Sequence, residues 1–262
     1  MPRSPASHLA AADPTLARII ASVGPYRPSA RHDGTHFDAV LRAIVYQQIS
    51  GAAASTILGR VFALFGGRSP TPDQLLGAPD ESLRAAGLSR QKIGYLRDLA
   101  AKAHSGEVPF DALGAQGDEE VIGELIKVKG VGRWTAQMFL MFRLERPNVL
   151  PVLDLGIQNA IRKAYGLRKR PTPERVARIG ARWAPHATLA CWYLWRSLEN
   201  GEGQAAGAKR RPAGKAAAPK RASQEVSPKV VSRTASQRLP KQSEARPAIA
   251  GKAPSSRART RR

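Results

Sequence analysis

Cysteine, acidic residues and aromatic residues are all scarce in this sequence of 262 residues, which also contains no long apolar run. The single cysteine, Cys191, excludes a disulfide within the chain and an iron–sulfur cluster held by four cysteines. No segment approaches the roughly 20 consecutive apolar residues of a membrane-spanning helix, and the N-terminus lacks the apolar core of a secretory signal. We therefore expect a soluble, intracellular protein that does not associate with a membrane.

The shortage of acidic residues gives a net charge of +22, from 42 Lys and Arg against 20 Asp and Glu. Residues 203–262 hold 16 basic and 2 acidic residues, so they contribute +14 and residues 1–202 contribute +8. This last segment is rich in Ala, Pro, Lys, Arg and Ser, and it cannot bury enough apolar surface to offset the entropy of ordering. We expect a disordered basic tail that binds DNA phosphates, with a solubilising role or a nuclear import signal as alternatives.

Residues 1–202 show helical periodicity and no sustained alternating strand pattern. Apolar residues at positions 37, 40, 41, 44 and 45 predict one helix, and residues 14–23 predict a shorter one. Thr71 and Thr172 each precede a proline, which is a start signal for a helix. We expect an all-α fold of about nine or ten helices, with an N-terminal segment at 1–35, a core of two helical lobes at 36–202 and the tail at 203–262.

Residues 125–136, LIKVKGVGRWTA, are the most informative segment because they place two glycines between two short amphipathic helices. The apolar faces of these helices comprise Val121, Leu125 and Val128 before the turn and Thr135, Met138, Phe139 and Phe142 after it. Without side chains at Gly130 and Gly132, the turn can reach positive φ, and a phosphate can approach backbone N–H groups at the start of the second helix. An ordinary tight turn between helices explains Gly-Val-Gly alone equally well.

Together with Asp154, 22 positions after Gly132, this hairpin resembles the helix-hairpin-helix DNA glycosylase superfamily. Within that superfamily it is similar to the alkylation-repair branch of 3-methyladenine DNA glycosylase II, from about Phe37 to Trp195. The resemblance implies a two-lobed helical fold and a monomeric enzyme that hydrolyses the N-glycosidic bond of alkylated purines in double-stranded DNA during base excision repair. The implied enzyme requires no cofactor. It would be associated with the nucleoid in a bacterial cytoplasm, or it would be located in a eukaryotic nucleus.

Asp154 is the candidate catalytic residue, and it also precedes a predicted helix, where aspartate is a common N-cap. The two roles are compatible, because backbone N–H groups that donate to the carboxylate favour the ionised form. An ionised carboxylate can stabilise an oxocarbenium-like sugar as the base departs. By resemblance, Asp154 matches the catalytic aspartate of the family. No general acid is required, because an N-alkylated base carries a positive charge and leaves as a neutral molecule.

Trp134 and Trp195 are implied by the resemblance to line the base pocket, where electron-rich rings attract a cationic base. Placement of both rings in the core is the alternative. Trp134 stands where bifunctional members of the superfamily have the lysine that forms a Schiff base, so a monofunctional enzyme is expected. Trp183 and Trp192 are assigned to the core.

The resemblance also implies the residues that contact DNA. To flip a base, the enzyme must fill the gap that the base leaves; Gln48 matches the wedge, although a plain surface position explains it equally well. The backbone N–H groups of the hairpin face phosphate, basic side chains assist them, and backbone carbonyls hold a structural monovalent cation. The phosphate-binding residues are Gly130, Gly132, Thr135, Lys129 and Arg133, and the cation ligands are the carbonyls of Ile126, Val128 and Val131.

Two departures from the family pattern are visible. Many relatives have an arginine near Ala187, and only about 35 residues precede Phe37, too few for the α/β N-terminal domain of larger bacterial members. Two other hypotheses remain: a non-catalytic protein that binds or compacts DNA, and a glycosylase for other damaged bases, such as a glycosylase-lyase for oxidised bases. Asp154 and the two tryptophans argue against the first, and Trp134 argues against a lyase.

Overall fold

The computed structural model describes residues 4–27 and 34–208, with the backbone alone from residue 200 onward. These residues form twelve α-helices and two short 3-10 helices and contain no β-strand, so the all-α prediction is confirmed. The expected number of helices was too low, because several helices are too short to show periodicity. The predicted disordered tail lies almost entirely outside the described residues.

The bounds of the helices follow the predicted periodic segments closely. In chain order they are α1 (Pro5–Ala12), α2 (Pro14–Val23), α3 (His36–Tyr46), α4 (Gly51–Ala63), α5 (Pro72–Gly77), α6 (Asp80–Ala85), α7 (Arg90–His104), η1 (Phe110–Ala115), α8 (Asp118–Leu125), α9 (Arg133–Phe142), α10 (Leu155–Ala164), α11 (Pro173–Gly180), η2 (Ala181–Trp183) and α12 (Ala187–Ala208). None of the described helices is both long enough and apolar enough to cross a membrane.

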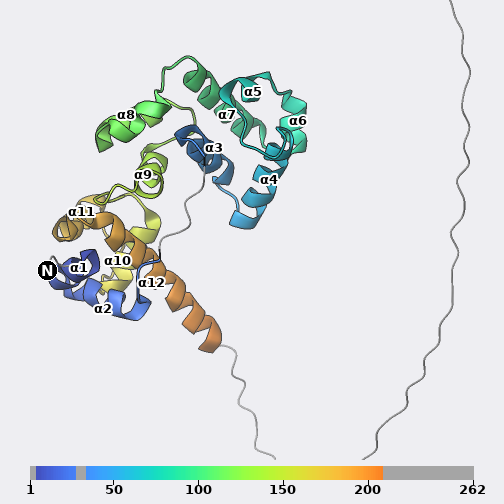
Figure 1. Cartoon of the computed structure of the whole chain (residues 1–262). Coiled ribbons are helices and arrows are strands. Elements are labelled where there is room, and N and C mark those ends of the chain that lie inside the picture. The colour runs from blue at the N-terminus through green and yellow to red at the C-terminus, as the bar shows by residue number, and fades with distance from the viewer. Residues whose placement is uncertain (1–3, 28–33, 209–262) are drawn as a thin grey trace, which may run out of the picture. The chain divides into compact units, whose positions relative to one another are not determined.

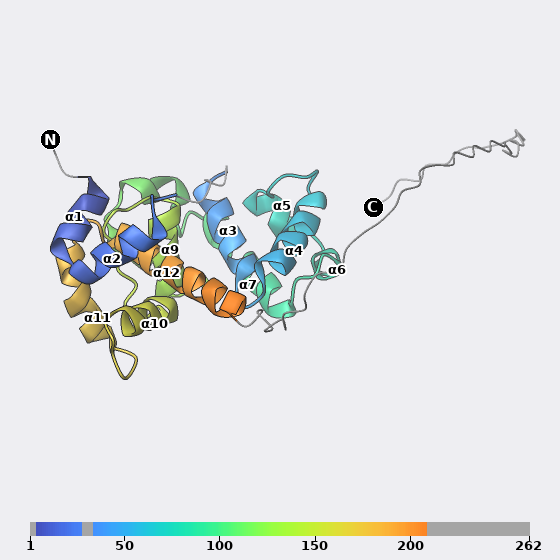
Figure 2. The same cartoon turned by 90° about the horizontal axis from the view of Figure 1, so that it is seen from below.

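The helices form two groups, which both views of the structure separate (Figures 1 and 2). One group consists of α3 to α7, in which α7 packs against α3, α5 and α6. In the other, α12 packs against α1, α2 and α10, and η2 contacts α1 and α11. Helices α8 and α9 pack on each other, and α9 also contacts α3. The hairpin between α8 and α9 is therefore connected directly to the first group.

Side-chain caps fix several helix starts where the sequence predicted them. Thr71 forms a capping box with Gln74, and Thr172 accepts a hydrogen bond from the backbone of Arg175. These caps satisfy N–H groups that have no partner inside the helix. The assignment of Trp183 and Trp192 to the core is also confirmed, since both side chains are buried.

A buried carboxylate, Asp13, lies at the junction of α1 and α2 and connects these two helices to Tyr165 and Trp183. Its Oδ1 accepts hydrogen bonds from the backbone N–H groups of Thr15 (2.9 Å) and Leu16 (3.2 Å), so it caps α2. Its Oδ2 accepts from the indole of Trp183 at 3.0 Å and from the hydroxyl of Tyr165. Because only 1% of Asp13 is exposed, these four donors replace the water that the carboxylate loses on folding.

The charge of Asp13 is stabilised by these contacts. Burial alone raises the pKa of a carboxyl group, but the donors from Tyr165, Trp183, Leu16 and Thr15 together hold the pKa of Asp13 below its ordinary value. Burial and the Asp13 carboxylate raise the pKa of the Tyr165 phenol, which therefore remains a hydrogen-bond donor. The sequence analysis identified the helix at 14–23 but not this contact with residues 152 and 170 positions away.

Replacing Asp13 with alanine should lower the free energy of unfolding by about 3 kcal/mol, because two buried donors lose their partner and α2 loses its cap. Ser4→Ala, which removes the exposed cap of α1, should cost about 1 kcal/mol or less. Because the pKa of Asp13 is lower in the folded chain, its contribution is complete above the unfolded pKa and is lost as pH falls through the folded value. Urea unfolding of both variants at pH 7 and pH 3 measures this; equal losses at pH 7 would contradict the role of Asp13.

Candidate active site

Asp154 is the N-cap of α10, as the sequence predicted, and its side chain is 8% exposed. Its Oδ1 accepts a hydrogen bond from the backbone N–H of Ile157 at 2.7 Å. Residues 151–154 turn back before the helix, with the N–H of Asp154 donating to the carbonyl of Pro151. Local sequence therefore places this carboxylate at the positive end of the helix dipole, which favours an anion.

Trp134 and Trp195 both donate hydrogen bonds to the carboxylate of Asp154. The Nε1 of Trp134, in the first turn of α9, lies 2.7 Å from Oδ2, and the Nε1 of Trp195, in α12, lies 3.0 Å from Oδ1. The sequence analysis had assigned these rings to the walls of a pocket, and the structure adds that their N–H edges orient the carboxylate. Three donors from three helices fix its position and stabilise its negative charge.

Cys191 is fully buried in α12 and interacts electrostatically with Asp154. Burial and the nearby charge of Asp154 both raise the pKa of the Cys191 thiol, so the sulfur stays neutral. A neutral, buried thiol is a poor nucleophile. Cys191 is therefore not a candidate nucleophile of this site.

Gly156 permits the contact between Trp195 and Asp154, and the sequence analysis did not single it out. A Cβ at this position would lie 2.9 Å from the Cδ1 and Nε1 atoms of Trp195 and 3.0 Å from Oδ1 of Asp154. Real side chains do not approach so closely, so α10 carries a glycine in its first turn despite the cost of glycine in a helix. A glycine in the first turn of a helix is unfavourable, and this sequence signal could have identified Gly156.

Phe142 corrects a second expectation, because it was predicted to lie on the buried face of α9. Its side chain is 50% exposed, and its ring centroid lies 6.0 Å from that of Trp195. The helix ends at this residue, so its last side chain turns away from the core. Phe142 adds a third aromatic surface beside Asp154, together with the exposed Trp134.

The hairpin between α8 and α9 has the predicted amphipathic flanks, with Val121, Leu125 and Val128 buried. Gly130 has φ +80°, and a side chain there would collide with the ring of Tyr95. Gly132 differs from the expectation of positive φ: it is extended, with φ −99° and ψ 174°, and forms the N-cap of α9. One glycine is thus required by the fold, and the other stands in open space.

No side chain caps α9 at Gly132. Because the first N–H groups of a helix lack partners within it, those of Arg133, Trp134 and Thr135 are available to an external anion. The side chain of Thr135 is buried, so only its backbone can serve this purpose. The start of α9 therefore has the properties of an anion site, as the sequence predicted from its glycines.

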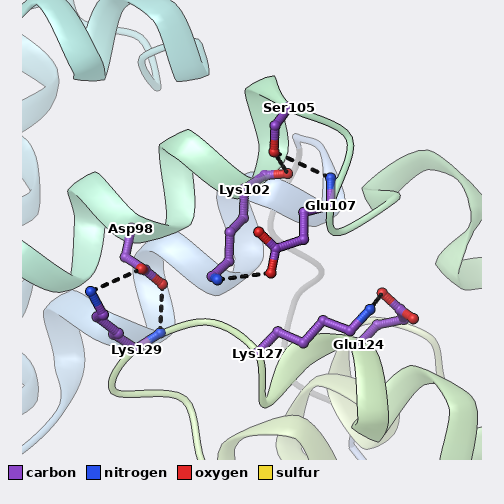
Figure 3. A network of polar contacts seen from close by, with 7 residues as sticks. All are labelled: Asp98, Lys102, Ser105, Glu107, Glu124, Lys127 and Lys129. Atoms are coloured by element: carbon purple, nitrogen blue, oxygen red, sulfur yellow. Dashed lines mark hydrogen bonds and ion pairs between the residues drawn. The ribbon is translucent and has the colours of Figure 1, made fainter.

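The two basic side chains that were predicted to assist phosphate binding are both ion-paired. Lys129 lies 3.5 Å from Asp98 of α7, whose Oδ2 also accepts the backbone N–H of Lys129 at 2.8 Å (Figure 3). Arg133 is paired with Glu119 of α8. Both basic side chains remain exposed to solvent, and exposed ion pairs are weak, so the electrostatic role of Lys129 and Arg133 stays a prediction.

Gln48 lies at an exposed turn between α3 and α4 and has φ +60°, an uncommon conformation for a residue other than glycine. The turn is fastened to the hairpin by the preceding residue, since Nε2 of Gln47 donates to the carbonyl of Gly130 at 2.9 Å. Lys92 of α7 donates to the carbonyls of Val45 (2.6 Å) and Gln47 (2.7 Å). Strained backbone held by its surroundings is typical of functional positions.

Helix α7 supports both the Gln48 turn and the hairpin from one face. Lys92, Tyr95 and Asp98 recur at intervals of three, so they share one side of the helix. Lys92 binds the turn, Tyr95 packs under Gly130, and Asp98 binds Lys129. The sequence analysis missed this support because its partners are separated by about 30 to 50 residues.

The carbonyls predicted to hold a monovalent cation lie in the turn after α8. Ile126 is the C-cap of α8, and the carbonyl of Val128 accepts the N–H of Val131 at 3.0 Å. The cation remains a prediction for this turn. Among the described residues, no cluster of three or more His, Cys, Asp or Glu side chains could hold a metal ion.

Residues 41–186 match the model of the HhH-GPD superfamily of base excision DNA repair proteins. The chain belongs to this family. The HhH-GPD match includes Gln48, the hairpin and Asp154, whereas Trp195 lies beyond its end. The structure brings Trp134 and Trp195 to Asp154, and it joins the turn at Gln47 to the hairpin.

Similar proteins are known in yeast and bacteria. DNA-3-methyladenine glycosylase 1 of Schizosaccharomyces pombe is 35% identical over 193 residues, which cover 72% of this chain and 85% of the relative. DNA-3-methyladenine glycosylase 2 of Escherichia coli is 29% identical over 184 residues, covering 66% and 62%.

Two solved structures are also similar to this HhH-GPD protein. The S. pombe 3-methyladenine DNA glycosylase, in complex with abasic DNA, has a TM-score of 0.68 at 34% identity and covers 74% of this chain and 96% of its own. A DNA-3-methyladenine glycosidase from Bacillus halodurans has a TM-score of 0.68 at 35% identity and covers 77% and 92%. These similarities support DNA as the binding partner of this protein.

Gly132→Ala should weaken binding to an abasic-site duplex by about tenfold, or 1.4 kcal/mol, because a methyl group would intrude where a phosphate meets the N–H groups of α9. Stability should change by less than about 0.5 kcal/mol, since the backbone is extended and nothing lies within 4 Å of the new Cβ. Fluorescence anisotropy and thermal unfolding measure the two effects. Gly123→Ala, in open space on α8, is the matched control; unchanged binding by Gly132→Ala would make the hairpin purely structural.

Proposed function

We propose that this protein is a monofunctional DNA glycosylase that removes alkylated purines, such as 3-methyladenine and 7-methylguanine, from double-stranded DNA in base excision repair. The observation that supports it most directly is the Asp154 carboxylate, held by Ile157, Trp134 and Trp195 within reach of exposed aromatic surfaces. The names of the S. pombe and E. coli relatives support the same substrate class. The protein acts as a monomer.

Binding begins with the phosphate backbone. The N–H groups at the start of α9 donate hydrogen bonds to a phosphate close to the lesion, and Gly132 leaves room for it. The damaged nucleotide then rotates out of the duplex, and Gln48 fills the space that it leaves. Because the side chain of Gln47 donates a hydrogen bond to the carbonyl of Gly130, the wedge and the phosphate site keep a fixed position relative to each other.

The flipped base enters the space beside Asp154. An N-alkylated purine carries a positive charge, so the faces of Trp134 and Phe142 each attract it by about 0.5 to 2 kcal/mol relative to a neutral base. The N–H edges of Trp134 and Trp195 are already directed at the carboxylate. Trp134 thus contributes both to the recognition of charge and to the orientation of the catalytic group.

Cleavage breaks the bond between C1′ of the sugar and the purine nitrogen. The electron pair of that bond moves to the cationic base, which leaves as a neutral molecule, and the sugar becomes an oxocarbenium-like cation. Asp154 stabilises this cation through its negative charge. Water then adds to C1′ and loses a proton, which leaves an abasic site. Trp134 offers no amine to form a Schiff base, so the strand is not cut.

Asp154→Asn should reduce base release at least about 100-fold, because the charge opposite the developing cation is removed. Duplex binding should stay within about threefold, or 0.7 kcal/mol, since the phosphate contacts are made elsewhere. Single-turnover release from alkylated DNA, followed by mass spectrometry of the free bases, measures the first effect. Asp111→Asn, an exposed aspartate in η1, is the control. Wild-type release by Asp154→Asn would refute the assignment, and no release by the wild type would favour a protein that only binds DNA.

Gln47→Ala should separate base flipping from cleavage. The hydrogen bond to Gly130 is exposed, so its loss should cost less than about 1.5 kcal/mol of stability. Release of a lesion paired in a duplex should fall by about tenfold, whereas release of the same lesion opposite a mismatched base, which flips more easily, should fall less. Gln74→Ala, which removes an exposed hydrogen bond from the backbone N–H of Thr71 at the start of α5, is the control. Equal losses on both substrates would show that Gln47 does not act on flipping.

A further inference from the structure

The positive charge of the described chain is concentrated in one part of it. Residues 34–146, which include the hairpin, have 13 Lys and Arg against 12 Asp and Glu. Residues 155–199, from α10 to α12, have 9 Lys and Arg against 2 Asp and Glu. The half of the fold that supplies the phosphate-binding hairpin is thus nearly neutral, and the excess lies in the half that follows Asp154.

Most of this excess forms one surface, which we call the α10–α11 basic surface. It spans the last turn of α10, the loop at residues 166–171 and one face of α11, and all of its basic side chains are exposed. Its members are Arg162, Lys163, Arg168, Lys169, Arg170, Arg175 and Arg178. Glu174 is the one acidic residue in this stretch of the sequence.

The seven cations differ from those near the hairpin in their partners. Lys127 pairs with Glu124 and Lys129 with Asp98 (Figure 3), and Arg133 pairs with Glu119. Within the part of the chain that the structure describes, no ion pair involves a member of the α10–α11 basic surface. Like charges so close together repel each other, and a bound polyanion relieves this repulsion.

The direction of α10 places this surface away from the lesion. Asp154 caps the N-terminus, where the damaged nucleotide must lie, and Arg162 follows eight residues later. At 1.5 Å per residue, the last turn is roughly 12 Å further along the axis. A helix that points its N-terminus at one duplex directs its C-terminus away from that duplex. The loop at residues 166–171 continues beyond this end.

We propose that the α10–α11 basic surface binds the phosphate backbone of a second duplex segment while the hairpin and Asp154 engage the first. This inference rests on the proposed action on DNA. Its chemistry is that of nonspecific binding, in which Lys and Arg replace counterions along the backbone without reading sequence. A protein with two such surfaces passes directly from one DNA segment to another, which shortens the search for rare lesions.

The test uses the full-length protein with Arg168, Lys169 and Arg170 all changed to Gln. The control removes the same charge from exposed positions in the neutral half, by Arg60→Gln, Arg68→Gln and Arg84→Gln. Dissociation from a labelled abasic-site duplex is followed while unlabelled, undamaged duplex is added at rising concentration. For the wild type and the control, the dissociation rate should increase with competitor, because a second duplex binds before the first leaves. For the loop variant, it should be nearly independent of competitor.

Base release from a lesion duplex of about 15 base pairs, measured in a single turnover, should agree within about twofold for all three proteins, since this surface does not contact the first duplex. The salt slope for binding long DNA should fall by roughly 0.9 for each phosphate contact that the loop variant loses. Residues 203–262 are the same in all three proteins, so differences belong to the surface. Three results would each overturn the proposal. The loop variant could show the same competitor dependence as the wild type, the wild type could show none, or the loop variant could lose base release from the short duplex. Absence of base release in the wild type would instead refute the proposed function.

Discussion

The arrangement of this protein depends on a carboxylate that is nearly buried. Asp154 accepts hydrogen bonds from Ile157 of α10, Trp134 of α9 and Trp195 of α12, so three helices must meet at one point. Burial of an ionised carboxylate without such donors is strongly unfavourable. The requirement explains a glycine in the first turn of α10, where any side chain would displace Trp195.

A second buried carboxylate repeats this solution about 140 residues earlier in the chain. Asp13 also caps a helix, also lies out of solvent and also accepts a tryptophan N–H, from Trp183. Its contacts hold α1 and α2 against the helices that position Asp154, through η2 and Tyr165. Asp154 lies beside exposed aromatic side chains and Asp13 is sealed in the core, so the same arrangement serves the proposed catalysis in one place and stability in the other.

The groups suited to binding DNA are divided between backbone and side chains in different parts of the fold. The hairpin offers N–H groups of α9, and its Lys129 and Arg133 form ion pairs with Asp98 and Glu119. Backbone donors at fixed positions orient a phosphate, whereas mobile basic side chains attract DNA over longer distances. The excess of unpaired charge on α10 and α11 therefore complements the hairpin.

Local sequence determined the helices, the hairpin and the position of Asp154, because periodicity, capping residues and paired glycines act over a few residues. The same reasoning misplaced two local details, since Gly132 is extended and Phe142 is exposed. It also failed where a neighbour distant in the sequence decides the outcome, as in the bond from Gln47 to Gly130, 83 positions away. The directions of the two indole N–H groups, 20 and 41 residues from Asp154, were equally invisible. Only tertiary packing fixes such contacts, because the energy of a buried charge depends on which donors the fold brings to it.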